Sequence, residues 1–190
     1  MRRTGLVQVV LLLAASTFAQ PLGASQTPWQ KLHRPLHLPR LAAGAACPVS
    51  QVDRRIDWQR VGIFGGSGIG RGPVYPGLGG SGGHLDVTPD DQYGGPWAGG
   101  KVFWYVRPSY PGRVLIRGRR LDGPQSLGFN GGVVPKPELR IHNYSVSWEG
   151  QPTGSRGIPS SVRVRSSGCY GVQIDGTTFS RIVVFTVTAP

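Results

Sequence analysis

The stretch KVFWYVR at residues 101–107 is the strongest indication of the fold in this sequence. Its apolar residues would lie on both sides of an extended chain, which is typical of a central strand covered on both faces. We therefore predict a strand here. The remainder of the C-terminal half can be interpreted from this starting point.

Further short runs rich in β-branched residues follow, and helical periodicity is almost absent. They lie at residues 113–117 (RVLIR), 161–165 (SVRVR), 170–174 and 179–188. Residues 138–148 also alternate, but their parity changes near His142, which indicates a bulge, a bend or two short strands. About six short strands with turn signals at nearly regular spacing predict an all-β protein, built as an antiparallel β-sandwich.

The segment before these strands has an unusual composition. Residues 62–100 hold 15 of the 30 glycines and four prolines. Because glycine makes ordering costly and proline removes a ladder hydrogen bond, we predict a long glycine-rich loop inserted in the domain. Within this loop, Tyr75 and Trp97 are the candidates for exposed aromatic contacts with a sugar or a partner protein.

The N-terminal end has the pattern of a secretory leader. Arg2 and Arg3 precede the apolar run LVQVVLLLAA at residues 6–15, and small residues follow. The run is shorter than the roughly 20 residues of a spanning helix, so we predict a cleaved signal peptide over residues 1–25 and no membrane span. Residues 26–46, rich in Pro, Gln, His and Ala, predict a flexible linker, and residues 47–190 the folded domain.

Two cysteines, Cys47 and Cys169, are present. In an exported chain a lone pair most simply forms one disulfide, although two free thiols or an intermolecular bridge are alternatives. If Tyr170, Val172 and Ile174 face the core, Cys169 faces the opposite way. The bridge would then join the segment that leads into the domain to an outer face or edge of the sheet.

The chain is strongly basic, with 21 Lys and Arg against 9 Asp and Glu. A positive surface attracts polyanions, so the expected partners are anionic cell-envelope components or another surface protein. Arg117, Arg119 and Arg120 are the candidates for a basic binding surface, which Arg163 and Arg165 could extend. Nucleic acid is not expected, because the aromatic residues fall mainly in predicted core strands and the chain is predicted to be exported.

Catalytic patterns in the glycine-rich segment lack the structural context that they need. GLGGSG at residues 77–82 matches GxGxxG, and residues 79–83 match GxSxG, but no helix follows either match. His84 beside Asp86, with Asp90 and Asp91, leaves a secreted hydrolase as an alternative. We predict no catalytic residue, no metal and no cofactor.

Three pieces carry a resemblance to a known group of proteins. They are CPVS at residues 47–50, the run GGKVFWYVRPSYPGRVLIRGRRLDGP at 99–124, and GIPSSVRVRSSGCYGVQIDGTTFSRIVVF at 157–185. In these the chain resembles uncharacterised secreted proteins of high-GC actinobacteria, which are similar in outline to immunoglobulin-like sandwiches. The resemblance implies an antiparallel immunoglobulin-like β-sandwich outside the cytoplasm, and no activity.

The combined prediction is a secreted, non-enzymatic binding or structural domain at the cell surface. The secreted hydrolase and a basic polyanion-binding protein are the two alternatives.

Overall fold

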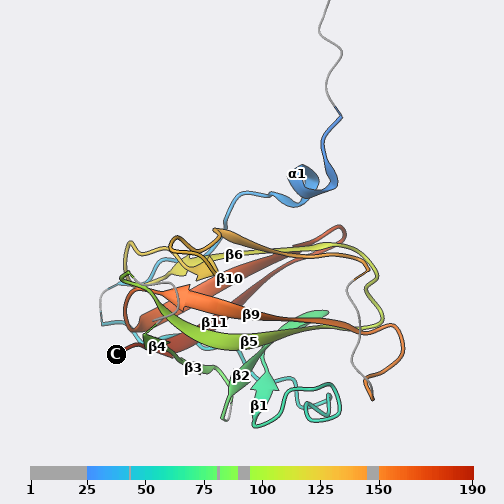
Figure 1. The fold of residues 1–190 in the computed structure, drawn as a ribbon, viewed down its shortest axis with the longest axis horizontal. Coiled ribbons are helices and arrows are strands. Elements are labelled where there is room, and N and C mark those ends of the chain that lie inside the picture. The colour runs from blue at the N-terminus through green and yellow to red at the C-terminus, as the bar shows by residue number, and fades with distance from the viewer. Residues whose placement is uncertain (1–24, 43, 81, 90–94, 145–149) are drawn as a thin grey trace, which may run out of the picture.

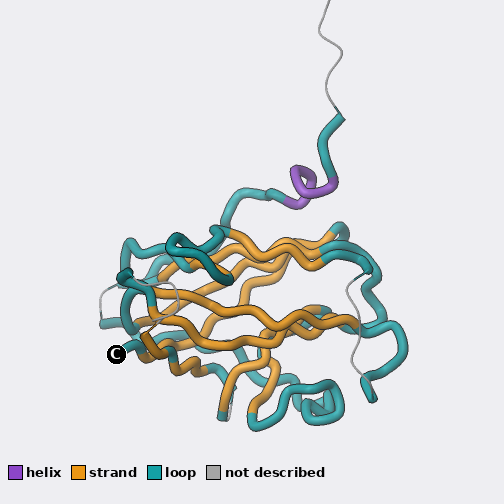
Figure 2. Tube along the Cα trace, in the orientation of Figure 1, coloured by secondary structure: helices purple, strands orange, loops and turns teal. Residues whose placement is uncertain are grey.

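The structure, a computed structural model, describes residues 25–42, 44–80, 82–89, 95–144 and 150–190. Strands and bridges hold 44% of the described residues and helix 3%, so the prediction of an all-β protein is confirmed (Figure 2). Residues 1–24 of the predicted signal peptide, and residues 145–148 of the predicted strand at 138–148, lie outside the described residues.

In chain order the elements are α1 (Pro28–Leu32), β1 (Gly66–Gly68), β2 (Val74–Gly79), β3 (His84–Asp86), β4 (Thr88–Pro89), β5 (Ala98–Val106), β6 (Val114–Arg120), β7 (Gly128–Phe129), β8 (Glu138–Ile141), β9 (Arg156–Val164), β10 (Gly168–Gly176) and β11 (Ser180–Thr188).

All eleven strands belong to one sheet with the order β7-β9-β5-β2-β3-β11-β10-β6-β8, to which β1 adds beside β2 and β4 beside β5. Every pairing is antiparallel except that of β3 with β11, which is parallel. The sheet curls until β7 and β8, at the two ends of this order, come into contact. It is therefore a mixed, nearly barrel-shaped sheet (Figure 1), and an antiparallel immunoglobulin-like sandwich is not confirmed.

The interior of this curled sheet holds the main apolar core. On β5 the alternation is clear, since Val102, Trp104 and Val106 are buried in the core, whereas Lys101 and Phe103 lie on the outer face. Residues Tyr170, Val172 and Ile174 of β10 also belong to the core. The period-2 pattern thus places large β-branched and aromatic residues inside, where their burial stabilises the fold.

The prediction of a long loop over residues 62–100 is wrong. That segment contributes β1 to β4 and the first residues of β5, and β2 lies near the middle of the sheet. Its glycines allow close packing instead of disorder. A Cβ on Gly77, for example, would lie 2.7 Å from Cδ1 of Ile63, so only glycine lets that side chain pack against β2.

The prediction of a flexible linker over residues 26–46 is also wrong for the described part of that range. Leu32, the last residue of α1, is buried, and after α1 the chain lies against the outer face of the sheet, where Leu38 is buried. The amide of Leu41 donates to the carbonyl of Leu121 at 2.8 Å. No helix in the described part of the chain is long and apolar enough to cross a bilayer.

Candidate functional site

Residues 51–65, here called the cap, cover the outer face of β2 and β5. Their side chains Trp58, Val61 and Ile63 form a small second core with Tyr75 of β2 and Tyr105 of β5. Trp58 meets both tyrosine rings edge-on, with ring centroids 5.2 and 6.3 Å away. The cap is therefore a packed layer that belongs to the folded domain.

A buried carboxylate attaches the cap to the sheet. Asp53, 7% exposed, accepts hydrogen bonds from the Tyr75 hydroxyl at 2.8 Å and from Nε and Nη2 of Arg55 at 2.8 and 2.7 Å. The bonds from Arg55 hold the pKa of Asp53 well below its usual range. Burial, followed by the bond to Asp53, raises the pKa of Tyr75.

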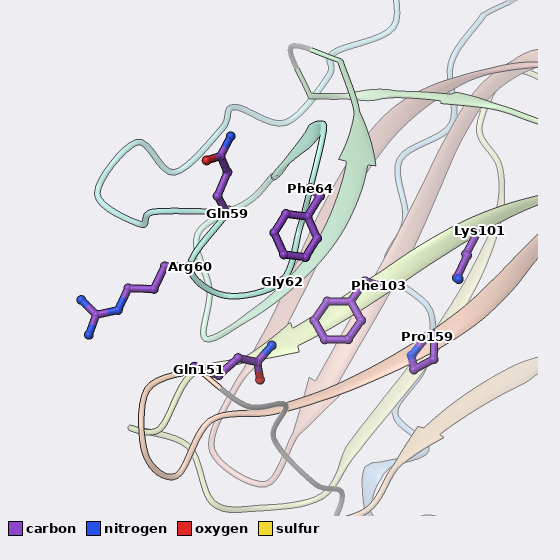
Figure 3. A pocket seen from close by; sticks show the side chains of 9 residues that line it. Gln59, Arg60, Gly62, Phe64, Lys101, Phe103, Gln151 and Pro159 are labelled. Carbon is purple, nitrogen blue, oxygen red and sulfur yellow. The ribbon is translucent and has the colours of Figure 1, made fainter.

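A pocket of about 610 Å³ opens beside the end of the cap. Figure 3 shows its wall, to which the rings of Phe64 and Phe103 both contribute. Phe103 of β5 and Pro159 of β9 are register partners on the outer face of the sheet. Phe64 comes from the cap and is 82% exposed. The lining is completed by Gln59, Arg60, Gly62, Lys101, Gly150 and Gln151.

The two charged side chains among the nine described lining residues are both positive. Arg60 and Lys101 form no ion pair with any described residue, and none of the nine lining residues carries a carboxylate, an imidazole, a thiol or a hydroxyl. Figure 3 shows Arg60 extending outward from the pocket. The geometry therefore suits a ligand with an apolar part against the two rings and an anionic part at the rim.

Sequence reasoning missed this pocket. Phe64 lies in a glycine-rich stretch with no recognisable pattern, so nothing in the sequence marks it as exposed. Lys101 and Phe103 belong to the stretch 101–107, and the alternation of that strand places them together on its outer face. The alternation of side chains along residues 101–107 was the one feature of the sequence that indicated this part of the pocket wall.

The aromatic residues predicted to make exposed contacts are buried. Tyr75 is 0% and Trp97 6% exposed. Trp97 packs beneath two arginines, with the guanidinium carbons of Arg165 and Arg163 at 4.5 and 5.9 Å from its ring centroid. The expectation of exposed contacts at Tyr75 and Trp97 is therefore wrong, because both rings serve internal packing.

The predicted basic surface of Arg117, Arg119 and Arg120 is used for internal contacts. Arg117 is buried and donates to Asp175 at 2.9 Å. Arg119 donates to the carbonyls of residues 38 and 39, and Arg120 to Asp122 at 2.6 Å. Arg163, which could have extended this surface, is 0% exposed. These residues do not present one basic face.

His84 and Asp86 are adjacent in space, as the hydrolase alternative requires, with Nε2 of His84 3.0 Å from Oδ1 of Asp86. Nδ1 of His84 lies 2.8 Å from the hydroxyl oxygen of Thr186. The Thr186 hydroxyl also lies 3.2 Å from the carbonyl of Gly83, and the tautomer of His84 decides whether its Nδ1 donates to that hydroxyl or accepts from it. Asp90 and Asp91 lie outside the described residues.

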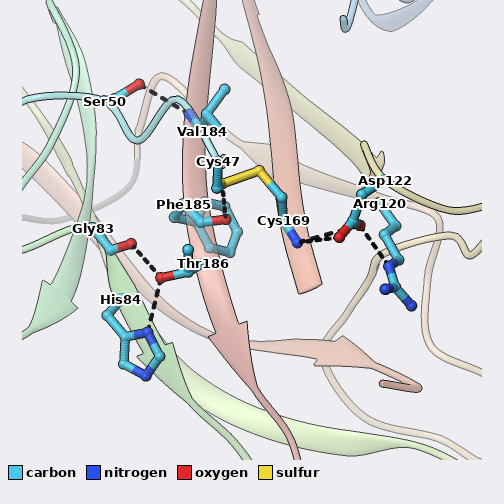
Figure 4. The surroundings of a disulfide bond; sticks show 10 residues. All are labelled: Cys47, Ser50, Gly83, His84, Arg120, Asp122, Cys169, Val184, Phe185 and Thr186. Atoms are coloured by element: carbon cyan, nitrogen blue, oxygen red, sulfur yellow. Dashed lines mark hydrogen bonds and ion pairs between the residues drawn. A yellow bond between two sulfur atoms is a disulfide. The ribbon is translucent and has the colours of Figure 1, made fainter. Parts of the chain in front are cut away.

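The predicted disulfide between Cys47 and Cys169 is confirmed, with Cα atoms 5.5 Å apart. Cys169 points away from the core and packs with Leu38, Leu121 and Val184. Figure 4 shows the bond at the outer face of β10 and β11, where Asp122 accepts from the amide of Cys169. The bridge is compatible with an extracellular or envelope location, since disulfides persist in oxidising compartments.

No family model and no curated protein matches the chain. A solved structure described as a putative lipoprotein from Bacillus anthracis is similar to it, with 12% sequence identity and a TM-score of 0.42. The likeness covers 64% of this chain and 78% of that one. A likeness this distant carries no functional argument.

Proposed function

We propose that the protein is an exported, non-enzymatic binding domain whose pocket beside Phe64 takes an anionic lipid at the surface of the cell envelope. The observation that supports this most is the exposed ring of Phe64 in the wall of a pocket of about 610 Å³ that two cations, Arg60 and Lys101, also line. A large apolar side chain next to unpaired positive charge is the pattern of a peripheral lipid contact.

The expected contributions to binding are modest and separable. Transfer of the exposed Phe64 side chain out of water contributes about 1.5–3 kcal/mol. Each cation near an anionic membrane surface contributes about 1 kcal/mol, and added salt screens this part. The apolar contribution is not screened, so the two can be measured apart.

Export is part of the same proposal. It is supported by the leader-like sequence over residues 1–25 and by the bond between Cys47 and Cys169. In that location the surfaces that a basic domain meets first are anionic head groups.

Vesicle sedimentation tests the proposal. The oxidised protein should bind vesicles of phosphatidylglycerol and phosphatidylcholine, and should bind vesicles of phosphatidylcholine alone much more weakly. Phe64→Ala should reduce binding at least about tenfold, in line with the loss of one buried ring, and Lys101→Gln about fivefold, in line with one lost cation.

Two variants elsewhere serve as matched controls. Val134, 77% exposed, and Lys136, also exposed, lie between β7 and β8, so Val134→Ala and Lys136→Gln should leave binding unchanged. Equal binding to both vesicle types, or an equal loss in the pocket variants and their controls, would overturn the proposal.

A further inference from the structure

Residues 34–41, here called the strap, lie along the outer face of β6 and β10 and are held there largely through their backbone. Nη2 of Arg117 donates to the carbonyl of Arg34 at 2.5 Å. The amide of Gln173 donates to the carbonyl of Pro35 at 3.0 Å and accepts from the amide of His37 at 2.8 Å. One glutamine side chain thus pairs with a donor and an acceptor of the strap, as a neighbouring strand would.

The contacts continue along the strap. Nη2 of Arg119 donates to the carbonyls of Leu38 and Pro39 at 2.8 and 3.1 Å. The strap then pairs its Leu41 amide with the carbonyl of Leu121. Backbone groups are common to all peptides, so most of this face would hold any extended chain laid in the same register.

Two features add side-chain selectivity. Nη1 of Arg34 donates to the carbonyl of Phe179 at 2.5 Å and lies 3.5 Å from Oδ1 of Asp175. Leu32 and Leu38 are 1% and 6% exposed, one on either side of Arg34. The bound sequence therefore begins at Leu32, the last residue of α1, two residues before the strap, and reads Leu-x-Arg-Pro-x-x-Leu over residues 32–38.

The residues beneath the strap are unusual for an outer sheet face. Gln173 and Asp175 are 1% and 0% exposed, and Arg117 is 7% exposed. Asp175 accepts from Arg117, Gln173 and Ser180 at 2.9, 2.9 and 2.7 Å. Buried charges contribute little stability compared with apolar residues of similar size, so stability alone does not explain this set. It is arranged to meet the polar groups of a peptide.

We propose that this face is a peptide-recognition groove, closed in the present structure by the strap, and that its partner is an extended peptide of another protein with the pattern Leu-x-Arg-Pro-x-x-Leu. This goes beyond the proposed lipid contact, because the groove and the pocket share no residue. Recognition rests on charge complementarity with the buried Asp175 and on two leucine anchors.

The connection of the strap to the domain allows it to leave the groove without unfolding the sheet. Small residues, Ala and Gly only, separate Leu41 from Cys47, and the bond of Cys47 to Cys169 fixes the chain beyond them. A tethered segment of this kind competes at an effective concentration on the order of millimolar. A free peptide therefore binds well only when the strap is weakened or displaced.

The test uses the full chain with an opened strap and a labelled probe peptide of residues 27–41. Arg34→Ala with Leu38→Ala in the full chain removes one ionic contact and one anchor. This opened chain should bind the probe at least tenfold more tightly than the wild type in fluorescence anisotropy. Adding Arg119→Gln to the opened chain should weaken binding about fivefold, whereas adding Lys136→Gln, a loss of charge away from the groove, should not. A probe with glutamate in place of Arg34 should bind at least tenfold more weakly.

Several outcomes would overturn the proposal. One is an opened chain that keeps its disulfide and its near-ultraviolet circular dichroism but binds the probe no better than the wild type. Another is equal binding of the probe with glutamate. A third outcome is that the wild type sediments as a dimer and that the probe dissociates this dimer. The groove would then bind a second copy of this chain, which would overturn the proposal of a different protein as partner.

Discussion

The hydroxyl of Tyr75 donates a hydrogen bond to Oδ2 of Asp53 over 2.8 Å, and this bond joins the cap to the middle of the sheet. Asp53 in turn carries the ion pair with Arg55, in which Nη2 lies 2.7 Å from Oδ2. The cap ends at the pocket wall, so the position of Phe64 depends on this attachment. Tyr75 is a positioning residue for the pocket and makes no contact with a ligand.

Replacing Tyr75 with phenylalanine should therefore destabilise the fold. Tyr75→Phe removes a buried hydrogen bond to a charged acceptor, which contributes about 1.5–3 kcal/mol, and leaves the ring packing unchanged. Urea unfolding measures the difference. Tyr144→Phe, at a residue that is 73% exposed, is the control and should change stability by less than about 0.5 kcal/mol. Equal effects of the two substitutions would show that the bond to Asp53 contributes nothing.

The same carboxylate predicts an acid dependence. Asp53 has a folded pKa below its unfolded value because Arg55 donates to it. Its contribution to stability is therefore complete above the unfolded pKa, about 3.9, and is lost as the pH falls toward the folded pKa. The free energy of unfolding of the wild type minus that of Asp53→Asn should be constant from about pH 7 to pH 5 and shrink below about pH 4. A difference that grows as the pH falls would contradict this assignment. Asp57→Asn, at an exposed position in the cap, serves as the control.

The strands after residue 100 could be predicted because their alternation records which side chains face the core. The same alternation placed Cys169 on the opposite face from Tyr170, as the structure has it. The strands at residues 66–89 could not be predicted, since glycine and proline leave no alternation of apolar and polar side chains. In those strands glycine is required by close contacts, such as that of Gly77 with Ile63 of the cap. These contacts exist only once the cap has packed on the sheet.

The arginines were misjudged for a related physical reason. Composition shows charge but not its partner, and Arg117 and Arg163 lie on strands whose outer faces other segments cover. Arg163 donates to the carbonyl of Gly132 in the connection between β7 and β8. Such long-range partners depend on topology. The sequence therefore predicts an excess of positive charge correctly and assigns it to the wrong surface.

The disulfide should contribute strongly to stability. It joins residues separated by 122 positions, and closing so long a loop restricts the unfolded chain by about 4–5 kcal/mol on the chain-entropy model. The double variant Cys47→Ser with Cys169→Ser should lose most of this, and reducing the wild type should have the same effect. Denaturant unfolding with and without reductant measures both. A loss below about 1 kcal/mol in either experiment would mean that residual structure already restricts the unfolded chain without the bond.

The buried ion pair beneath the strap should be costly to break from one side. Asp175→Ala leaves the guanidinium of Arg117 buried without its carboxylate, for which about 3–5 kcal/mol is expected. His84 and Asp86 form a pair at the surface, with side chains 43% and 84% exposed, so Asp86→Ala should cost at most about 1 kcal/mol. Thermal unfolding of the two variants side by side separates the cases, and similar losses would contradict the burial argument.

The floor of the pocket depends on a glycine. Gly157 of β9 is the register partner of Tyr105, and the ring of Phe103 lies directly over it, so that an added Cβ would overlap the ring edge. Gly157→Ala should therefore turn Phe103 away from β9 and into the pocket, because the ring moves more easily than the paired strands. Binding to phosphatidylglycerol vesicles should fall about as far as in Phe64→Ala, while stability changes by about 1–3 kcal/mol, as for other overpacked sites.

Gly79→Ala is the matched control, since a Cβ there meets nothing within 4 Å. Because alanine at residue 157 adds no charge and removes no contact, unchanged binding in a folded Gly157→Ala variant would show that Phe103 does not line the site that the lipid occupies.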